Sequence, residues 1–262
     1  MPDESETWHY GLVARWWAEF NVATPIELAF YRTMIERYGQ PALDLACGTG
    51  RLLLPLLGAG LDVDGCDISE DMVALCRERA ARDGLKPRLY VQASGEIDLP
   101  RAYRTIYICD SFGIAGSAET LRRCHQHLAP GGALAFNVHL PYAEADRWNC
   151  WLPEYRRTLP EVWPDTGTRK RASNGDEIEL RSRRLDLDPL EQVWTREIRA
   201  MLWRDGQVAK EEVHRLRERA FFRNEVLLLL AEAGFTAVAV NGDYDERDVK
   251  EDDLMLVFIA RK

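Results

Sequence analysis

The sequence predicts an α/β protein in which a largely parallel sheet is covered by helices on both faces. Three observations support this fold class. Short apolar runs alternate with helical patterns over much of the 262 residues, the connections between them are short, and a glycine turn follows the first apolar run. With 46% hydrophobic and 29% charged residues, the composition is ordinary for a globular chain that forms one domain or a domain with an elaboration.

The N-terminal segment is expected to be helical and rich in aromatic residues. Thr24 followed by Pro25 predicts the start of a second helix, with the threonine as its N-cap. Trp16 and Trp17 are adjacent, so their side chains diverge on a helix and cannot share one face. We expect one of them to pack in the core. The other, together with Tyr10, either packs as well or covers a ligand.

The alternation of strands and helices begins after Pro41. We expect strands over 42–46, 61–67, 88–93, 104–109 and 132–139, and helices over 51–59, 69–82 and 117–128. Ser69 predicts the start of the second of these helices as its N-cap, and Pro130-Gly131-Gly132 predicts a turn before the fifth strand. The alternation resumes near the C-terminus with a helix over 222–233 and strands over 235–241 and 254–260.

A different pattern separates the fifth strand from the last helix. Residues 141–167 are irregular and rich in tryptophan and proline. Three turn signals then follow at hairpin spacing: Asn174-Gly175, Asp188-Pro189 and Asp205-Gly206. We therefore expect an antiparallel meander over 168–220, inserted into the α/β domain. Its basic clusters are expected to lie on solvated strand faces: Arg169-Lys170-Arg171 and Arg181, Arg183 and Arg184.

Charge and cysteine content exclude several classes of function. A net charge of −9 argues against nucleic acid as a partner, because such binding needs a basic face. No window approaches the ~18 apolar residues of a membrane span, and the acidic N-terminus is followed by no apolar signal segment. We therefore expect no membrane association and a cytoplasmic location. The six cysteines lack the spacing of a zinc site, so we expect reduced, buried thiols and no metal.

The glycine turn, in Ala46-Cys47-Gly48-Thr49-Gly50-Arg51, joins a buried strand to a helix and points backbone N–H groups at a small-molecule site. A nicotinamide-binding turn would carry a third glycine three residues after Gly50, where this chain has Leu53. Asp67, at the end of the second strand, could accept hydrogen bonds from ribose hydroxyls, but any adenosine ligand offers that diol.

Taken together, these segments resemble class I S-adenosylmethionine-dependent methyltransferases of the methyltransferase domain 25 type. Leu43-Asp44-Leu45-Ala46-Cys47-Gly48-Thr49-Gly50 is similar to the first motif of that family, and Asp67 matches its ribose-binding acid. The segments Val91-Gln92-Ala93-Ser94, Cys109-Asp110-Ser111-Phe112 and Leu128-Ala129-Pro130-Gly131-Gly132 match its later motifs. The resemblance implies a Rossmann-like seven-stranded sheet of order 3-2-1-4-5-7-6, with strand seven antiparallel, and an N-terminal helical lid.

The resemblance also implies S-adenosylmethionine as the cofactor and S-adenosylhomocysteine as the product. With the aromatic residues of the lid, the expected cofactor-binding residues are Tyr10, Trp16, Asp44, Ala46, Cys47, Gly48, Gly50, Asp67, Ile68, Met72, Ser94, Gly95, Glu96, Cys109, Asp110 and Ser111. His139 is the candidate catalytic base, because it ends the fifth strand and histidine titrates near neutral pH. A packed histidine at a strand end is the alternative. The expected substrate contacts are Tyr142, Trp148 and Trp151.

We expect three segments: a lid over 1–40, a cofactor-binding α/β domain over 41–140 and 221–262, and an inserted sheet over 141–220. The insertion is expected to supply a wall of the acceptor pocket and a homodimer contact, and plain packing of its tryptophans against the α/β domain is the alternative. The expected reaction is methyl transfer to a nitrogen or oxygen of a small molecule. Nitrogen is favoured, because such insertions resemble those of amino-sugar N-methyltransferases. The alternatives are a catalytically silent S-adenosylmethionine-binding protein and a nucleotide-dependent oxidoreductase, which Leu53 disfavours.

Overall fold

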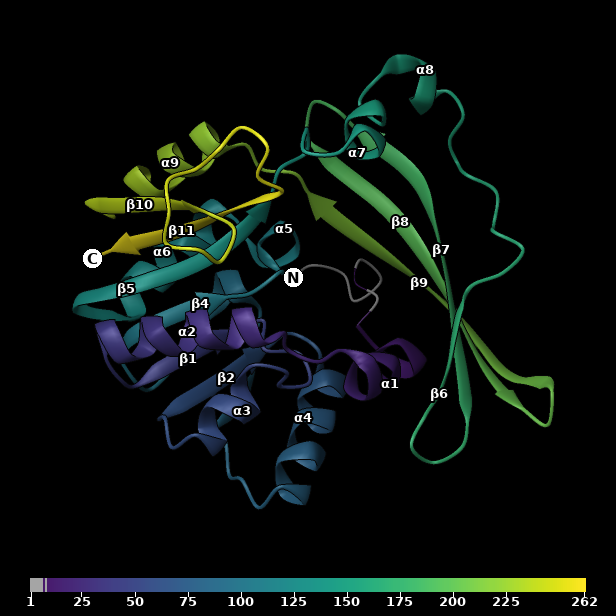
Figure 1. Cartoon of the computed structure of the whole chain (residues 1–262), viewed down its shortest axis with the longest axis horizontal. Helices are drawn as coiled ribbons and strands as arrows, with labels where there is room; N and C mark the ends of the chain where they lie inside the picture. Colours follow the sequence, from purple (N-terminus) through teal and green to yellow (C-terminus); the bar gives the residue numbers. More distant parts are fainter. Residues whose placement is uncertain (1–6, 8) are drawn as a thin grey trace.

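Seven strands form one mixed sheet in the order β10-β11-β5-β4-β1-β2-β3. A computed structural model describes residues 7 and 9–262, and this sheet lies in its larger part (Figure 1). The strands are β1 (Ala42–Leu45), β2 (Val63–Asp67), β3 (Leu89–Val91), β4 (Tyr103–Ile108), β5 (Leu128–His139), β10 (Ala237–Gly242) and β11 (Met255–Arg261). β11 runs antiparallel to both neighbours, and the remaining neighbours pair in parallel. The predicted sheet order and the antiparallel seventh strand are confirmed.

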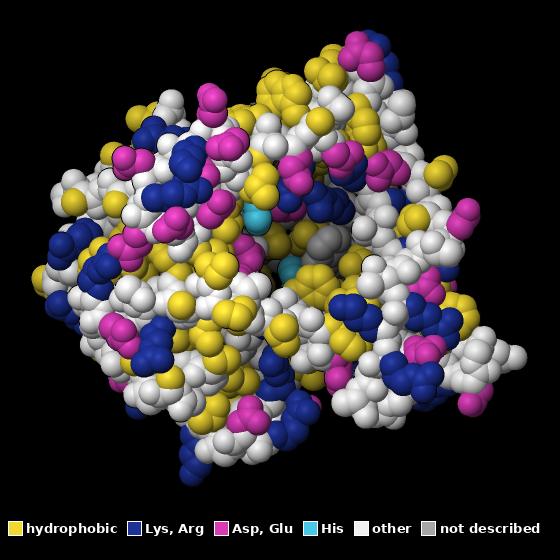
Figure 2. Space-filling model, viewed as in Figure 1, with side chains coloured by type: hydrophobic (Ala, Val, Ile, Leu, Met, Phe, Trp, Pro, Cys, Tyr) yellow, Lys and Arg dark blue, Asp and Glu magenta, His cyan; other side chains and the backbone are white. Residues whose placement is uncertain are grey.

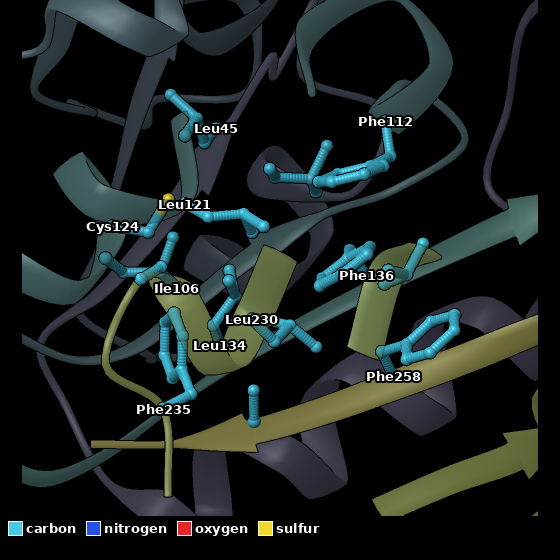
Figure 3. Close-up of a cluster of buried hydrophobic side chains, with 14 of the residues drawn as sticks. Leu45, Ile106, Phe112, Leu121, Cys124, Leu134, Phe136, Leu230, Phe235 and Phe258 are labelled. Atoms are coloured by element: carbon cyan, nitrogen blue, oxygen red, sulfur yellow. The ribbon is translucent and has the colours of Figure 1, made fainter. Parts of the chain in front are cut away.

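Helices cover both faces of this sheet, and each face has its own hydrophobic cluster. One face carries α2 (Pro25–Tyr38), α3 (Leu53–Gly58) and α4 (Glu70–Arg82), and the other carries α5 (Phe112–Ala115), α6 (Ala118–His127) and α9 (Arg223–Glu232). On the second face, Phe136 of β5 stacks between Phe112 and Phe258, with ring centroids 4.1 and 5.3 Å away (Figure 3). Burial of these large rings stabilises the sheet against its helices. Within the described residues, no helix is both long and apolar enough to cross a membrane.

Two predicted helix starts are formed by the expected N-cap residues. The Thr24 hydroxyl accepts from the backbone N–H of Glu27, while the Glu27 carboxylate accepts from the N–H of Thr24 at 2.7 Å. This reciprocal pair satisfies N–H groups that a helix start leaves without intrahelical partners. The Ser69 hydroxyl accepts from the N–H of Met72 in the same way. Both helices therefore begin where the cap residues predict.

A second, four-stranded antiparallel sheet lies beside the first (Figure 1). Its strands, in chain order, are β6 (Thr168–Arg171), β7 (Glu177–Asp188), β8 (Val193–Arg204) and β9 (Gln207–Arg219). Asp205 and Gly206 both have positive φ angles, +50° and +76°, as a two-residue hairpin turn requires. The meander predicted over 168–220 is thus confirmed.

Helix α1 (Gly11–Phe20) bridges the two sheets. Leu12 and Val13 pack in a cluster with Ile198 of β8. The N-terminal N–H groups of the helix are held from both sides: Asp71 of α4 accepts from Gly11 at 2.7 Å, and Glu212 of β9 accepts from Leu12 at 2.7 Å. Carboxylates are favoured at this end of a helix. The helix is therefore tied to both parts of the molecule.

Three short helices were not predicted: α5, α7 (Ala145–Asn149) and α8 (Pro153–Arg156). Each contains about one turn, which is too short to produce a helical period in the sequence. β5 begins at Leu128, four residues earlier than expected, because Leu128 pairs with Tyr103 before an irregularity in the register. The predicted turn at 130–132 thus lies within the strand.

Both basic clusters were expected to lie on solvated strand faces, but only one of them does. Residues 168–171 are exposed, as expected. By contrast, the side chains of Arg181, Arg183 and Arg184 are only 20–23% exposed. The prediction was wrong for these three because each pairs with an acid of the same region, for example Arg183 with Glu197 at 2.7 Å.

Candidate functional site

A large cavity opens where the carboxyl ends of β1, β2 and β4 meet α1 and the second sheet. Its volume is about 630 Å³, within the range of small-molecule sites. Figure 2 shows the corresponding hollow between the two parts of the molecule. Open parallel sheets bind ligands at this edge. The cavity is lined by Ala46, Cys47 and Gly48 after β1, by Asp67 and Ile68 at the end of β2, and by Cys109 and Ser111 after β4.

The two glycines of the turn after β1 have different roles. Gly48 has a φ of +53°, and a Cβ built on it would meet no atom within 4 Å. The backbone at Gly48 therefore faces open cavity. A Cβ on Gly50 would lie 2.7 Å from the Cys76 sulfur and 2.9 Å from Leu54. Gly50 does not line the cavity, and the predicted cofactor contact is replaced by a packing role: only glycine fits against α3 and α4 there.

Asp67 ties the glycine turn to the end of β2. Its Oδ2 accepts from the N–H of Gly48 at 2.8 Å, and its Oδ1 accepts from the N–H of Ser69 at 2.9 Å. Burial raises the pKa of the Asp67 carboxyl, although these two N–H groups act in the opposite direction. A carboxylate has about four lone-pair sites, so each oxygen keeps acceptor capacity for a ligand hydroxyl.

Asp44 and Leu53 lie outside the cavity wall. Asp44 is 3% exposed within β1, and burial raises the pKa of its carboxyl to about 7. Leu53 occupies the position of a dinucleotide fingerprint's third glycine. A Cβ on Gly65 of β2 would lie 2.8 Å from Leu53 Cδ2, so the small residue is on the strand and the large one on the helix. The helix and the strand therefore pack closely, as they do at a dinucleotide-binding turn, but here the glycine is on the strand instead of the helix.

The end of the cavity near β3 carries Ser94, Gly95 and Glu96. The Ser94 hydroxyl donates to the carbonyl of Ala115 at 2.5 Å and lies 3.2 Å from the Thr120 hydroxyl. The donor of Ser94 is therefore used within the protein. Glu96 supplies a carboxylate at the same end of the cavity.

Asp110, directly after β4, lies at the centre of a hydrogen-bonded network. It has a φ of +54°, a conformation that non-glycine residues seldom adopt. Its carboxylate accepts from Arg51 at 2.8 Å and from the Asn137 amide at 2.6 Å, and His139 Nε2 lies 3.6 Å away. Burial alone would raise the pKa of Asp110, but His139, Asn137 and Arg51 together hold it well below its usual range. Asp110 is therefore ionised.

Arg51 also pairs with Glu27 of α2 at 2.9 Å, and both side chains are largely buried. Donor atoms of Glu27, Cys109 and Asp110 lie close enough to one another to hold a metal ion. The Arg51 guanidinium, however, already contacts all three residues. The positive charge that these groups require is thus supplied by the arginine.

The predicted base, His139, lies in a second, smaller cavity. This cavity has a volume of about 60 Å³ and lies at the carboxyl ends of β4 and β5, against β8 and β9. Asp110 lines it rather than the large cavity. Gly113 of α5 and Arg219 of β9 line both cavities, so the two adjoin at these residues. His139 therefore lines a cavity that adjoins the large one.

The side chains of Trp16 and Trp17 in α1 point in different directions, as expected. Trp16 was predicted to contact the cofactor, but Trp17 is the one that lines the cavity. Trp17 lines the large cavity together with Tyr10. Trp16 is 7% exposed and packs against Phe20 and the second sheet, with the Phe20 ring centroid 4.6 Å away. Adjacent residues project about 100° apart on a helix, so only one can face the cavity.

The structure brings most of the predicted cofactor residues together. Twelve line the large cavity: Tyr10, Ala46, Cys47, Gly48, Asp67, Ile68, Met72, Ser94, Gly95, Glu96, Cys109 and Ser111. Four do not: Trp16, Asp44, Gly50 and Asp110. The expected substrate residues line neither cavity: Tyr142 faces the ring of Phe222, Trp151 packs on Trp194, and Trp148 is 45% exposed. Trp151 packs in a cluster with Cys150, Leu187 of β7 and Trp194 of β8, so it lies beside the small cavity, which Trp194 lines, without lining it itself.

The sequence analysis predicted a pocket wall from the inserted sheet but named none of the strand residues that line the large cavity. Val193, Arg217 and Arg219 line it from the adjacent ends of β8 and β9. No local signal distinguishes these residues from others on the same strands. Only the folded arrangement brings them to the first sheet.

Residues 42–132 match the model of a family described as a methyltransferase domain. The chain carries a methyltransferase domain. Its matched residues run from β1 into β5, and they supply the sheet side of the large cavity. The predicted resemblance is thus confirmed for the part of the chain that carries its motifs.

Relatives and solved structures extend this likeness to nearly the whole chain. A protein named as a methyltransferase in Geobacillus sp. (strain WCH70) is 24% identical over 97% of this chain and 99% of its own length. An S-adenosylmethionine-dependent methyltransferase from Clostridium acetobutylicum superposes with a TM-score of 0.70 at 19% identity, over 92% of each chain. An amino pentose methyltransferase from Micromonospora echinaspora, solved with S-adenosylmethionine bound, gives 0.63 at 20% identity over 98% of each chain. The methyltransferase domain and the inserted sheet thus occur together in known folds.

Proposed function

We propose that the chain transfers a methyl group from S-adenosylmethionine to a nitrogen or oxygen atom of a small-molecule acceptor, with nitrogen favoured. The observation that carries this proposal is the large cavity at the strand ends, where Gly48 presents bare backbone beside the Asp67 carboxylate. A sugar N-methyltransferase from Streptoalloteichus sp., a solved structure with this fold (TM-score 0.66 at 19% identity), supports nitrogen as the acceptor atom.

The residues of the cavity fit the parts of this cofactor. We assign the ribose hydroxyls to Asp67, because its oxygens keep free lone pairs, and the methionine end to the backbone at Gly48. The adenine fits beside Ile68, with Glu96 as the acceptor for its amino group. Tyr10 and Trp17 form the aromatic cover, and aromatic faces attract sulfonium and ammonium groups.

When bound, S-adenosylmethionine supplies a methyl group on a positively charged sulfur, which is a good leaving group. An unprotonated acceptor nitrogen would use its lone pair to form the new N–C bond. The electron pair of the C–S bond would stay on sulfur, which gives S-adenosylhomocysteine as the product. The methylated nitrogen then loses its extra proton to His139, whose side chain is 44% exposed and can pass it to water. The protein's main contribution is to hold the nitrogen and the methyl carbon close together and aligned, an effect worth about 7–11 kcal/mol at most.

The division into segments follows from this assignment. We propose that residues 1–40 cover the cofactor, that 41–140 with 221–262 bind it, and that the insertion over 141–220 supplies the acceptor wall through Val193, Arg217 and Arg219. We also propose a homodimer contact through the inserted sheet, because β6 and most of β9 are exposed at its two edges. Sedimentation of the protein at several concentrations tests the dimer.

Calorimetry with S-adenosylmethionine and NADH separates the proposed enzyme from its alternatives. We expect S-adenosylmethionine and S-adenosylhomocysteine to bind and NADH not to bind, since Leu53 fills the third-glycine position. Radiolabelled cofactor and a panel of small amines and hydroxyl compounds then measure turnover. Binding of NADH would support an oxidoreductase, and cofactor binding without turnover on any acceptor would support a silent binding protein.

A further inference from the structure

The small cavity beside His139 is lined by an unusual number of arginines. Four of them contribute to it: Arg147 of α7, Arg184 of β7, Arg196 of β8 and Arg219 of β9. The acids that line it are Asp110 and Glu218. Its volume of about 60 Å³ suits a small group rather than a whole substrate. The cavity thus combines an excess of positive charge with room for one compact polar group.

Three of these arginines are paired with nearby carboxylates. Arg147 contacts Glu144 at 2.9 Å, Arg184 contacts Asp146 at 2.6 Å, and Arg219 contacts Glu225 at 2.9 Å. These partners lie outside the residues that line the cavity. The three guanidinium groups are therefore held in place while still bordering the cavity.

Arg196 differs from the other three. The carboxylate that pairs with it, from Glu218, is 3.9 Å away, beyond hydrogen-bond distance. Its Nε is buried away from the cavity and has no hydrogen-bond partner among the described residues, which is also true of Arg199 on the same strand. The outer Nη groups of Arg196 are not among the buried atoms, and the Glu218 carboxylate is too far away to accept from them. Arg196 lines the cavity, so a group bound there could accept hydrogen bonds from these Nη groups.

The surroundings strengthen the attraction of this site for an anion. Trp194, Phe112 and Phe221 line the same cavity and are almost fully buried. An apolar wall lowers the effective dielectric and makes charge-assisted hydrogen bonds stronger. Of the two acids, Asp110 is already held by Arg51 and Asn137. The planar fork of Arg196 matches the two oxygens of a carboxylate or phosphate.

We infer that the small cavity binds a carboxylate or phosphate group of the methyl acceptor, with Arg196 as its main donor. The inference rests on the proposed methyl transfer and names its substrate class: a small amine or alcohol that carries an acidic group. Because Gly113 and Arg219 border both cavities, an acceptor anchored at Arg196 can extend its nucleophile past Gly113 into the large cavity. His139 lies beside that path, in the position to receive the proton.

A matched pair of variants tests this site. Arg196→Gln removes the charge from the cavity. Arg199→Gln removes one from the same strand at a similar side-chain exposure, 29% against 33%, and Arg199 lines neither cavity. The probes are inorganic phosphate and sodium acetate, followed by NMR of the arginine Nε–H signals. We expect both anions to bind wild type and Arg199→Gln alike and to bind Arg196→Gln at least about tenfold more weakly. Equal binding to all three proteins would overturn the inference.

A second test measures the rate of methyl transfer to matched pairs of acceptors. Each acceptor acid is compared with its neutral amide and each phosphate ester with its free alcohol, using radiolabelled S-adenosylmethionine. We expect the acidic member to have a kcat/KM about 10- to 150-fold higher in wild type, with that preference lost in Arg196→Gln. The pairs show which anion, carboxylate or phosphate, is used. Equal rates for acid and neutral partners would contradict the inference.

Two controls keep this inference separate from the proposed function. S-adenosylmethionine affinity, measured by calorimetry, should stay within about twofold in both variants. If wild type binds no S-adenosylmethionine, the proposed function fails. The binding of phosphate at Arg196 can still be measured, because that measurement does not require the cofactor. Should Arg196→Gln not fold, wild type alone decides: inorganic phosphate should compete with the acceptor and not with S-adenosylmethionine. Inhibition that competes with the cofactor would place the anion in the large cavity and refute the assignment.

Discussion

The carboxylate of Asp67 accepts a hydrogen bond from the backbone N–H of Gly48 at 2.8 Å. This bond joins the end of β2 to the turn after β1, so the acid that borders the cavity also fixes the shape of the glycine turn. Side chain and backbone therefore form one unit of the cavity wall, and a change at either residue alters both.

Asp67→Ala should weaken S-adenosylmethionine binding by about 10- to 150-fold, because charge-assisted bonds of this kind are worth about 1.5–3 kcal/mol. Calorimetry measures the change. Asp67→Asn is the control, since an amide oxygen still accepts from one backbone N–H. It should recover stability toward denaturant more than it recovers affinity. A loss of affinity below twofold in the alanine variant would show that Asp67 only positions the turn and caps the helix.

Gly48→Val should abolish S-adenosylmethionine binding. Its side chain would project into the cavity, where a Cβ meets nothing within 4 Å, and a β-branched residue is strained at a φ of +53°. Gly60→Val is a matched control, because Gly60 also has a positive φ and open space around a Cβ but does not line the large cavity. Both variants should lose stability, and only Gly48→Val should lose binding. Intact binding in Gly48→Val would refute the site assignment.

Arg51→Met should destabilise the protein by about 3–5 kcal/mol, because it leaves Glu27 buried without its positive partner. Urea unfolding in the absence of ligand measures this. Arg32→Met removes the exposed pair with Glu36, whose side chains are 56% and 51% exposed, and should cost less than about 1 kcal/mol. Similar losses in the two variants would mean that the network around Asp110 does not stabilise the fold.

The unfolding free energy should depend on the ionisation of Asp44. Burial raises the pKa of its carboxyl to about 7, above the unfolded value near 3.9, so the folded state binds the proton more tightly. Stability from this group therefore falls as pH rises from about 4 to about 7. Relative to wild type, Asp44→Asn should gain on the order of a few kcal/mol over that range.

Asp62→Asn provides the contrast for this pH dependence. Hydrogen bonding to Arg101 lowers the pKa of Asp62, so its contribution is lost only as pH falls below about 4. The difference between this variant and wild type should stay flat from pH 4 to 7. A flat profile for Asp44→Asn as well would show that Asp44 is ionised throughout this range.

The two ends of the inserted sheet should differ in importance. Val193 and Arg219 line the large cavity, whereas the Asp205-Gly206 turn lies at the opposite end of β8 and β9. Shortening that turn should leave S-adenosylmethionine affinity and turnover within about twofold. Arg219→Gln should lower turnover at least about tenfold with little change in cofactor affinity. If turnover falls with the shortened turn and survives in Arg219→Gln, the acceptor wall lies elsewhere on the sheet.

Much of the fold follows from signals within short stretches of sequence. Thr24 and Ser69 cap the helices they predict, and the Asp205-Gly206 pair forms the expected turn. Local chemistry decides such features, so one stretch is enough to recognise them. α5 was missed for the opposite reason, because its four residues gain their helical form from packing between β5 and β9.

The site is predictable only where one motif builds it. The turn from Ala46 to Gly48 and the acid at Asp67 belong to the first two strands, and they meet because parallel neighbours end at one edge. The choice between Trp16 and Trp17 depends on a sheet more than 150 residues away, which no helical pattern encodes. Arg219 reaches the cavity by the same long-range packing.

The position of β11 bears on how the chain is made. β11 is the last strand of the chain, yet it lies between β5 and β10 and pairs with both. A ribosome delivers residues in order from the N-terminus, so β10 has no route into the sheet until Met255–Arg261 has left the exit tunnel. Until then one edge of β5 is bare, and Phe136 lacks the ring of Phe258. The nascent methyltransferase domain therefore has a sheet edge that is exposed to edge-to-edge aggregation until β11 has been made.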